Sequence, residues 1–188
     1  MKTQTFAVQY RRKRSGKTDY RRRVRMISGF DTRIVVRRTL GGLLLQVAEY
    51  GNTGDKVTHS VRSQDLKKLG WNYDPKNLPS AYLAGYKLGK MIGNKEIIAD
   101  IGETKSVGGG RIYAALKGLV DAGVALRVSE EVLPPMNRIN GSHIAAYAKH
   151  LKEKGEKIYQ KQFGAAVKRG AIPENIVKAF AETKEKIK

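Results

Sequence analysis

Apolar and polar residues alternate in three short runs in the first third of the chain. The runs cover residues 34–38, 43–50 and 56–61. Gly41-Gly42 separates the first run from the second, and the glycine-containing segment 51–55 separates the second from the third. Because strands joined by such short turns pair with their neighbours, this part of the chain predicts an antiparallel three-stranded meander.

After a short helical turn at residues 63–68, the apolar spacing becomes that of helices. We expect, in chain order, a helix at 78–91, a buried strand at 96–101, and helices at 111–122 and 142–154. The first of these helices carries Ala81, Gly85 and Gly89 at helical spacing, which predicts a face packed closely against the sheet. The order of elements predicts an α/β fold, with a mixed sheet that starts with the meander and has helices packed on it.

The two ends of the chain differ from this body. Residues 1–28 are expected to form a basic N-terminal arm with a short helix from Tyr20 to Ser28, capped by Thr18 or Asp19. Residues 29–154 are expected to form the α/β core domain. Residues 155–188 are expected to form a basic helical C-terminal extension of one or two helices, docked on the body or on a neighbour.

Charge follows the same division. The chain carries a formal net charge of +20, and residues 1–25 contain ten Lys or Arg but one acidic residue. The last 40 residues add 11 basic and 5 acidic residues, so the body between is only moderately basic. A hydrophobic content of 40% still allows a packed core. This distribution indicates a folded body with basic ends that bind a polyanion.

Several function classes are disfavoured. The chain has no cysteine, which removes disulfides and thiolate metal sites. No apolar stretch approaches the length of about 18 residues that a membrane span needs, and no export signal is visible, so we expect no membrane partner and a cytosolic location. A mitochondrial import peptide, also basic and poor in acids, remains an alternative for the first twenty-odd residues.

Catalytic signatures are also missing. The sequence has no phosphate-binding loop, dinucleotide fingerprint or nucleophile elbow. His59, His143 and His150 are too few and wrongly spaced for a standard metal site, so we expect no metal and no cofactor. Asp100 lies on the expected buried strand with few acidic neighbours, and a structural role suits it better than nuclease chemistry.

Binding chemistry is concentrated in the arm. Arginine side chains that clamp phosphates alternate there with Tyr10 and Tyr20, whose rings can stack on unpaired bases. Arg138 and His143, at the start of the helix at 142–154, are further candidates for RNA contact, although capping and turn roles explain that segment as well. The candidates supported by this pattern are Tyr10, Arg11, Arg12, Lys13, Arg14, Lys17, Tyr20, Arg21, Arg22, Arg23, Arg25, Arg138 and His143. Composition favours structured RNA over DNA, because no helix-turn-helix or zinc module is visible.

Five segments resemble one known family. They are Tyr10-Arg11-Arg12-Lys13-Arg14-Ser15-Gly16-Lys17-Thr18-Asp19-Tyr20, Leu78-Pro79-Ser80-Ala81-Tyr82-Leu83-Ala84-Gly85, Asp100-Ile101-Gly102, residues 114–123, and residues 137–147. In this order, spread over about residues 6–154, they resemble the large-subunit ribosomal protein family that binds 5S rRNA, number eighteen in the universal naming, in its archaeal form.

The resemblance implies a protein without enzymatic activity that joins 5S rRNA to the large-subunit rRNA at the central protuberance. Its implied partners are 5S rRNA, the large rRNA and neighbouring large-subunit proteins, including the other 5S rRNA-binding protein, and its implied location is the cytoplasmic ribosome. The turn at residues 39–43 departs from the family pattern, which leaves Arg37 and Arg38 as substitute RNA contacts there. An RNA-processing enzyme, or an architectural nucleic-acid-binding protein outside the ribosome, remains the alternative.

Overall fold

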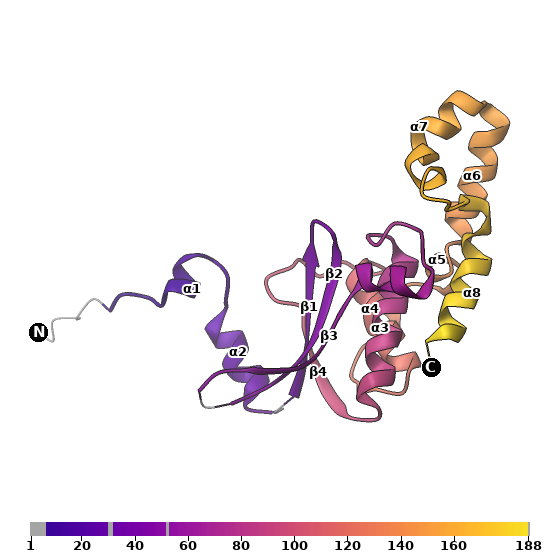
Figure 1. The fold of residues 1–188 in the computed structure, drawn as a ribbon. Coiled ribbons are helices and arrows are strands. Elements are labelled where there is room, and N and C mark those ends of the chain that lie inside the picture. Colours follow the sequence, from indigo (N-terminus) through magenta and orange to yellow (C-terminus); the bar gives the residue numbers. More distant parts are fainter. Residues whose placement is uncertain (1–6, 30–31, 52, 188) are drawn as a thin grey trace, which may run out of the picture.

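The computed structural model describes residues 7–29, 32–51 and 53–187. Its centre is a five-stranded mixed sheet in the order β3-β2-β1-β4-β5 (Figure 1). The strands are β1 (Thr32–Thr39), β2 (Gly42–Glu49), β3 (Lys56–Arg62), β4 (Glu96–Asp100) and β5 (Ala125–Leu126). Strands β1, β2 and β3 pair antiparallel, whereas β4 runs parallel to both β1 and β5. The structure confirms the expected α/β fold and its initial meander.

Layers form on both faces of the sheet. In Figure 1, α2 (Tyr20–Ile27), the sheet, the pair α3 (Leu78–Ile92) and α4 (Arg111–Asp121), and then α8 (Ile176–Lys186) follow one another from left to right. The alternation along β1 explains this arrangement. Its fully buried Ile34 and Val36 belong to the main hydrophobic core, while the alternating residues Arg33, Val35 and Arg37 point to the opposite face, toward α2.

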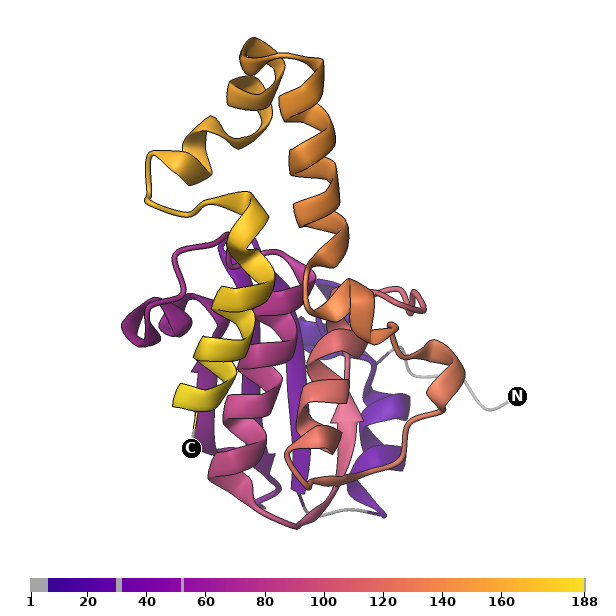
Figure 2. The ribbon, with the colours of Figure 1, turned by 90° about the vertical axis from the view of Figure 1, so that its right-hand side faces the viewer.

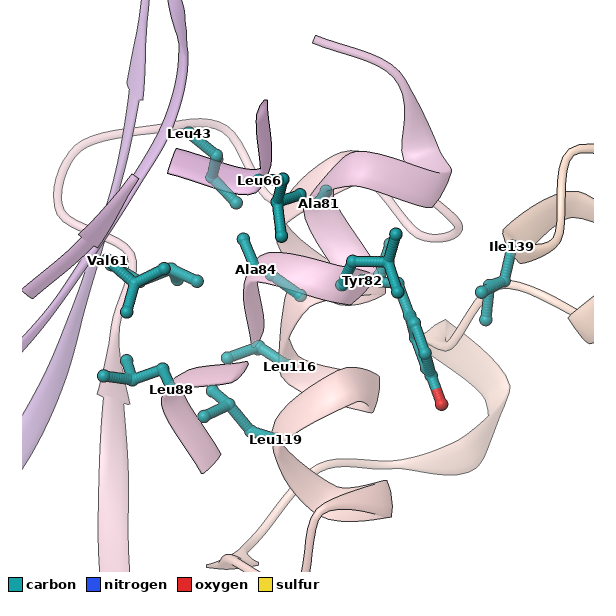
Figure 3. Packing of buried hydrophobic residues seen from close by; sticks show 14 of the residues in the cluster. Leu43, Val61, Leu66, Ala81, Tyr82, Ala84, Leu88, Leu116, Leu119 and Ile139 are labelled. Atoms are coloured by element: carbon teal, nitrogen blue, oxygen red, sulfur yellow. The ribbon is translucent and has the colours of Figure 1, made fainter. Parts of the chain in front are cut away.

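The core lies between the sheet and α3–α4 (Figure 3). Side chains from β2, β3, the 3₁₀-helix η1 (Ser63–Leu69), α3, α4 and α5 (Met136–Ile139) point toward one another there. One polar group inside this core is satisfied by a neighbour: the fully buried Trp71 donates its indole N–H to Ser80 Oγ at 2.7 Å. Burial of this apolar surface is the main stabilising contribution to the fold.

The small-residue face of α3 packs against α4. A Cβ atom added at Gly85 would lie 2.0 Å from the carbonyl oxygen of Ala115, and one at Gly89 would lie 2.6 Å from Ala122 Cβ. The contact is reciprocal, because a Cβ at Gly118 of α4 would lie 2.2 Å from the carbonyl oxygen of Tyr82. The prediction that Gly85 and Gly89 meet the sheet was therefore wrong: they bring two helix backbones together.

The described chain ends in three longer helices, α6 (Ser142–Lys154), α7 (Glu156–Val167) and α8. α6 and α7 form a hairpin that projects from the body (Figure 2), with a small core of its own around Leu151 and Tyr159. After the 3₁₀-helix η3 (Pro173–Asn175), α8 returns to the body. It contributes Phe180 to the main core, and Lys184 Nζ donates to the Tyr82 hydroxyl at 3.0 Å.

The remaining elements are short. The arm contains α1 (Arg11–Arg14) as well as α2, and the 3₁₀-helix η2 (Glu130–Val132) precedes α5. The sheet has two edges: β5 is two residues long, and β3 exposes most of its side chains. Of the expected turn at 51–55, Asn52 lies outside the described residues, as does the start of the arm, residues 1–6. No helix in the described part of the chain is long and apolar enough to cross a bilayer.

Candidate RNA-binding surface

The arm is organised by one acidic residue. Asp19 caps α2, and its Oδ1 accepts the backbone N–H groups of Arg21 at 3.0 Å and Arg22 at 3.2 Å. This satisfies donors that the first turn of a helix leaves free, and it places an anion at the positive end of the helix dipole. The Tyr10 and Tyr20 rings lie 5.2 Å apart between centroids, so the two aromatic residues predicted as base platforms are neighbours.

Two arginines hold α2 on the outer face of the sheet. Arg22 donates from Nη1 to the carbonyl oxygen of Gly102 at 2.9 Å. Arg23 donates from Nη2 to both carboxylate oxygens of Asp55, at 2.9 and 2.8 Å. These contacts join the arm to loops that lie 80 and 32 residues further along the chain. Both arginines were predicted to bind RNA, and in this structure both bind protein groups.

An ion-pair network centred on the buried Arg33 continues beneath α2. Arg33, with 4% of its surface exposed, pairs with Asp55 and lies 3.8 Å from Asp100, measured from Nε to Oδ2. Arg37 donates to the Asp100 carboxylate at 3.1 Å and to its backbone carbonyl at 2.7 Å. The other Asp100 oxygen accepts the N–H of Gly102 at 2.8 Å. Asp100 thus has the structural role expected for it.

The network also affects the ionisation of Asp55. Partial burial alone raises the pKa of this carboxyl, but the hydrogen bonds and charges of Arg23 and Arg33 outweigh it, so the pKa lies below its ordinary value of 3.8. Asp55 therefore stays charged at neutral pH and compensates the buried Arg33 guanidinium. In the described residues, no group of three or more His, Cys, Asp or Glu side chains could hold a metal ion.

The remaining cations of the arm between residues 7 and 28 are exposed. Within the described residues, none of them forms an ion pair with a carboxylate, so their charge is available to an external anion. These residues are Arg11, Arg12, Lys13, Arg14, Lys17, Arg21 and Arg25, and Arg38 at the end of β1 shares this property. A groove of about 430 Å³ between the arm and the sheet brings Arg12 and Lys17 next to Arg37.

Arg138 and His143 lie apart from this surface. They belong to α5 and α6, on the other side of the sheet from α1 and α2 (Figure 1). Burial and the nearby Arg138 charge lower the pKa of His143, which is therefore neutral at pH 7. The glycine-rich loop at 106–111, which precedes α4, uses its Gly109 and Gly110 N–H groups for the carbonyls of Val132 and Val107, so these two groups are not free to bind a phosphate.

Sequence reasoning missed the carboxylates that pair with the arginines. Asp55 lies in a turn and Asp100 at the end of a strand, and nothing in their local sequence indicates a basic partner. The alternation of Arg33 and Arg37 along β1, on the face opposite Ile34 and Val36, was the one available signal. A positively charged strand face that is covered by a helix, as this one is by α2, needs acidic partners.

Similarity to known proteins identifies the family of this chain. The family described as ribosomal large subunit proteins 60S L5 and 50S L18 matches residues 4–99, slightly more than half of the chain. The chain belongs to this L5/L18 family. The large ribosomal subunit protein uL18 of Korarchaeum cryptofilum (strain OPF8) is 43% identical over 185 residues, which are 97% of this chain and 94% of that relative. Membership in the L5/L18 family makes the chain a ribosomal large-subunit protein, and the suspected resemblance is confirmed.

Proposed function

We propose that the protein binds 5S rRNA through its N-terminal arm and attaches it to the large-subunit rRNA at the central protuberance. The observation that carries this proposal is the separation of the arm's charges into two groups. Arg22 and Arg23 fix α2 to the sheet, whereas the seven other Lys and Arg residues in the described part of the arm, residues 7–28, stay exposed without a carboxylate partner. Anchored in this way, α2 presents its own exposed cations, Arg21 and Arg25, in a fixed pattern close to those of α1, which suits the phosphates of a folded RNA.

The paired tyrosines support RNA as the polyanion. Tyr10 is 72% exposed and lies against Tyr20, so its ring is free to stack on an unpaired base. In this proposal the role is structural and not enzymatic, no cofactor takes part, and neighbouring large-subunit proteins, including the other 5S rRNA-binding protein, are further partners in the cytoplasmic ribosome.

The direct test is binding of the purified protein to folded 5S rRNA at near-physiological salt, with tRNA as competitor and duplex DNA as a second probe. We expect clear preference for 5S rRNA. Equal affinity for 5S rRNA and tRNA would mean that charge alone explains binding and would refute the specific function. Preference for duplex DNA would instead support an architectural role on DNA.

A triple variant then tests the arm. We expect Arg11→Ala, Arg12→Ala and Arg14→Ala together to weaken 5S rRNA binding and to reduce the slope of log K against log salt by about 0.7–0.9 for each lost phosphate contact. The matched control replaces three exposed lysines of the body, Lys67, Lys68 and Lys178, with alanine and removes the same charge. An equal loss in both variants would show that the arm acts only through net charge.

A further inference from the structure

A second groove lies on the other side of the molecule from the arm. Its volume is about 690 Å³, and it is lined by the segment 73–77, by α5 and the adjacent end of α6, by the second half of α7 and by the start of η3 and α8. Figure 2 shows α6 and α7 projecting beyond the sheet, so this groove opens at the base of the projecting hairpin.

The rim of the groove is cationic. Lys76, Arg138 and Arg169 line it, and all three are exposed. The lining contains one acidic residue, Asp74, whose Oδ1 already accepts the backbone N–H of Lys76 at 2.7 Å. Among the described residues none of the three cations forms an ion pair with a carboxylate. The groove is therefore complementary to an anionic ligand.

Its wall is aromatic. The Tyr147 side chain is 49% exposed, and its ring lies edge-on to that of Phe163, with centroids 6.2 Å apart. Both residues line the groove together with His143, whose buried Nδ1 has no hydrogen-bond partner in the described protein. A flat, half-exposed ring beside uncompensated cations is the combination that binds single-stranded nucleic acid, because bases stack while phosphates pair with the cations.

We propose that this groove takes an unpaired nucleotide of ribosomal RNA, with the base stacked on Tyr147 and the adjoining phosphates held by Arg138, Arg169 and Lys76. The inference rests on the proposed function, because it takes RNA as the ligand, but it assigns RNA to a surface separate from the arm. An acidic peptide would match the charges of the rim, but its carboxylates would not use the exposed Tyr147 ring. RNA uses both features.

Binding of fluorescently labelled oligouridine to the full chain tests the aromatic wall. We expect Tyr147→Ala to weaken binding by about 5- to 150-fold, the effect of losing one stacked base. Because tyrosine carries no charge, the salt slope stays unchanged, and binding of duplex RNA, whose bases are already stacked, is not weakened. The control is Tyr50→Ala, which removes a tyrosine of similar exposure (46%) that does not line the groove.

The cationic rim has its own test. We expect Arg138→Ala combined with Arg169→Ala to lower the salt slope for oligouridine by about 0.7 per lost contact. Lys157→Ala combined with Lys161→Ala removes the same charge from exposed positions of α7 outside the groove and is the control. Photocrosslinking of 5-iodouridine oligomers to the wild-type protein is expected to modify Tyr147 or Phe163. This experiment uses no variant, so its result does not depend on whether a substituted protein folds.

Several results would overturn the proposal. They are crosslinks found only in the arm, equal oligouridine affinity of Tyr147→Ala and Tyr50→Ala, or a polyglutamate peptide whose binding falls as much as that of RNA when Tyr147 is replaced. The proposed function fails separately, if the wild-type protein does not prefer 5S rRNA to tRNA. If the arm variant loses 5S rRNA affinity while Tyr147→Ala binds oligouridine normally, the groove proposal alone is refuted.

Discussion

Replacing Gly85 with alanine tests the contact on which the packing of α3 against α4 depends. The added methyl group would lie 2.0 Å from the carbonyl oxygen of Ala115 and 2.8 Å from its carbonyl carbon. These are backbone atoms of α4, so no side chain can rotate away to make room. The two helices must separate by more than about 1 Å, which loosens fully buried contacts on both sides, such as Ala84 and Leu119.

Two opposing effects set the size of the change. Alanine improves helix propensity over glycine by about 1 kcal/mol. Overpacking in a core costs about 1–3 kcal/mol, and an obstruction by rigid backbone belongs at the upper end of that range. We therefore expect Gly85→Ala to lower the free energy of unfolding by about 2 kcal/mol. For a domain of this size this corresponds to a fall in Tm of about 4–8 °C.

The chain contains a matched control. Gly164 lies inside α7, and a Cβ atom added there meets nothing within 4 Å. Gly164→Ala therefore keeps the propensity gain without the clash, and we expect its Tm to rise by about 1–4 °C. Thermal unfolding followed by circular dichroism at several scan rates measures both variants. A Gly85→Ala variant as stable as Gly164→Ala would refute the close helix contact and the reasoning built on it.

Two further variants test the ionisable groups. Asp55→Asn should lower stability at pH 7 by about 1–3 kcal/mol, because it leaves the buried Arg33 facing only Asp100, whose carboxylate is 3.8 Å away. Since the pKa of Asp55 is lowered in the folded state, its contribution is present above 3.8 and is lost as pH falls through the folded pKa. Urea midpoints should thus differ at pH 7 and converge in acid; equal midpoints at pH 7 would contradict the network. Burial and the hydrogen bond to Glu174 raise the pKa of Tyr159 to about 12, so stability should fall as pH rises above 10.0. Burial also raises the pKa values of Tyr73 and Tyr82, so ultraviolet titration should show several late-ionising tyrosines. In Glu174→Gln the ionisation of Tyr159 should move to lower pH, and an unchanged titration would count against that hydrogen bond.

Most of the fold was predictable because its elements have strong local patterns. The alternation in residues 34–38 gave a strand that the structure extends to Thr32–Thr39, and the apolar spacing with a proline at the start gave α3. β5 was missed because two residues are too few to show a period. The small-residue face of α3 was predicted, but its partner was not. Glycine spacing indicates that another element packs closely against the helix, but it does not indicate whether that element is a strand or, as here, the helix α4.

The candidate surface was predictable as a list of charges and not as an arrangement. Local sequence shows the density of arginine between residues 11 and 25, and it shows Asp19 as a cap. It does not show that Arg23 meets Asp55 or that Arg22 meets Gly102, because these pairings form only when distant segments fold together. An ion pair across such a separation has no signature in either local segment.

The two edges of the sheet affect how readily the protein aggregates while it is not bound to RNA. An unpaired strand edge can pair with a strand of another chain and so start aggregation. This protein, with a net charge of +20, is open to such pairing as long as no polyanion is bound. One edge, β5, offers only two residues, and the other, β3, begins with Lys56 and ends with Arg62. A second copy that paired along β3 would bring like charges together at both ends. The same positive charge that draws the protein to RNA thus also keeps free copies from aggregating with one another.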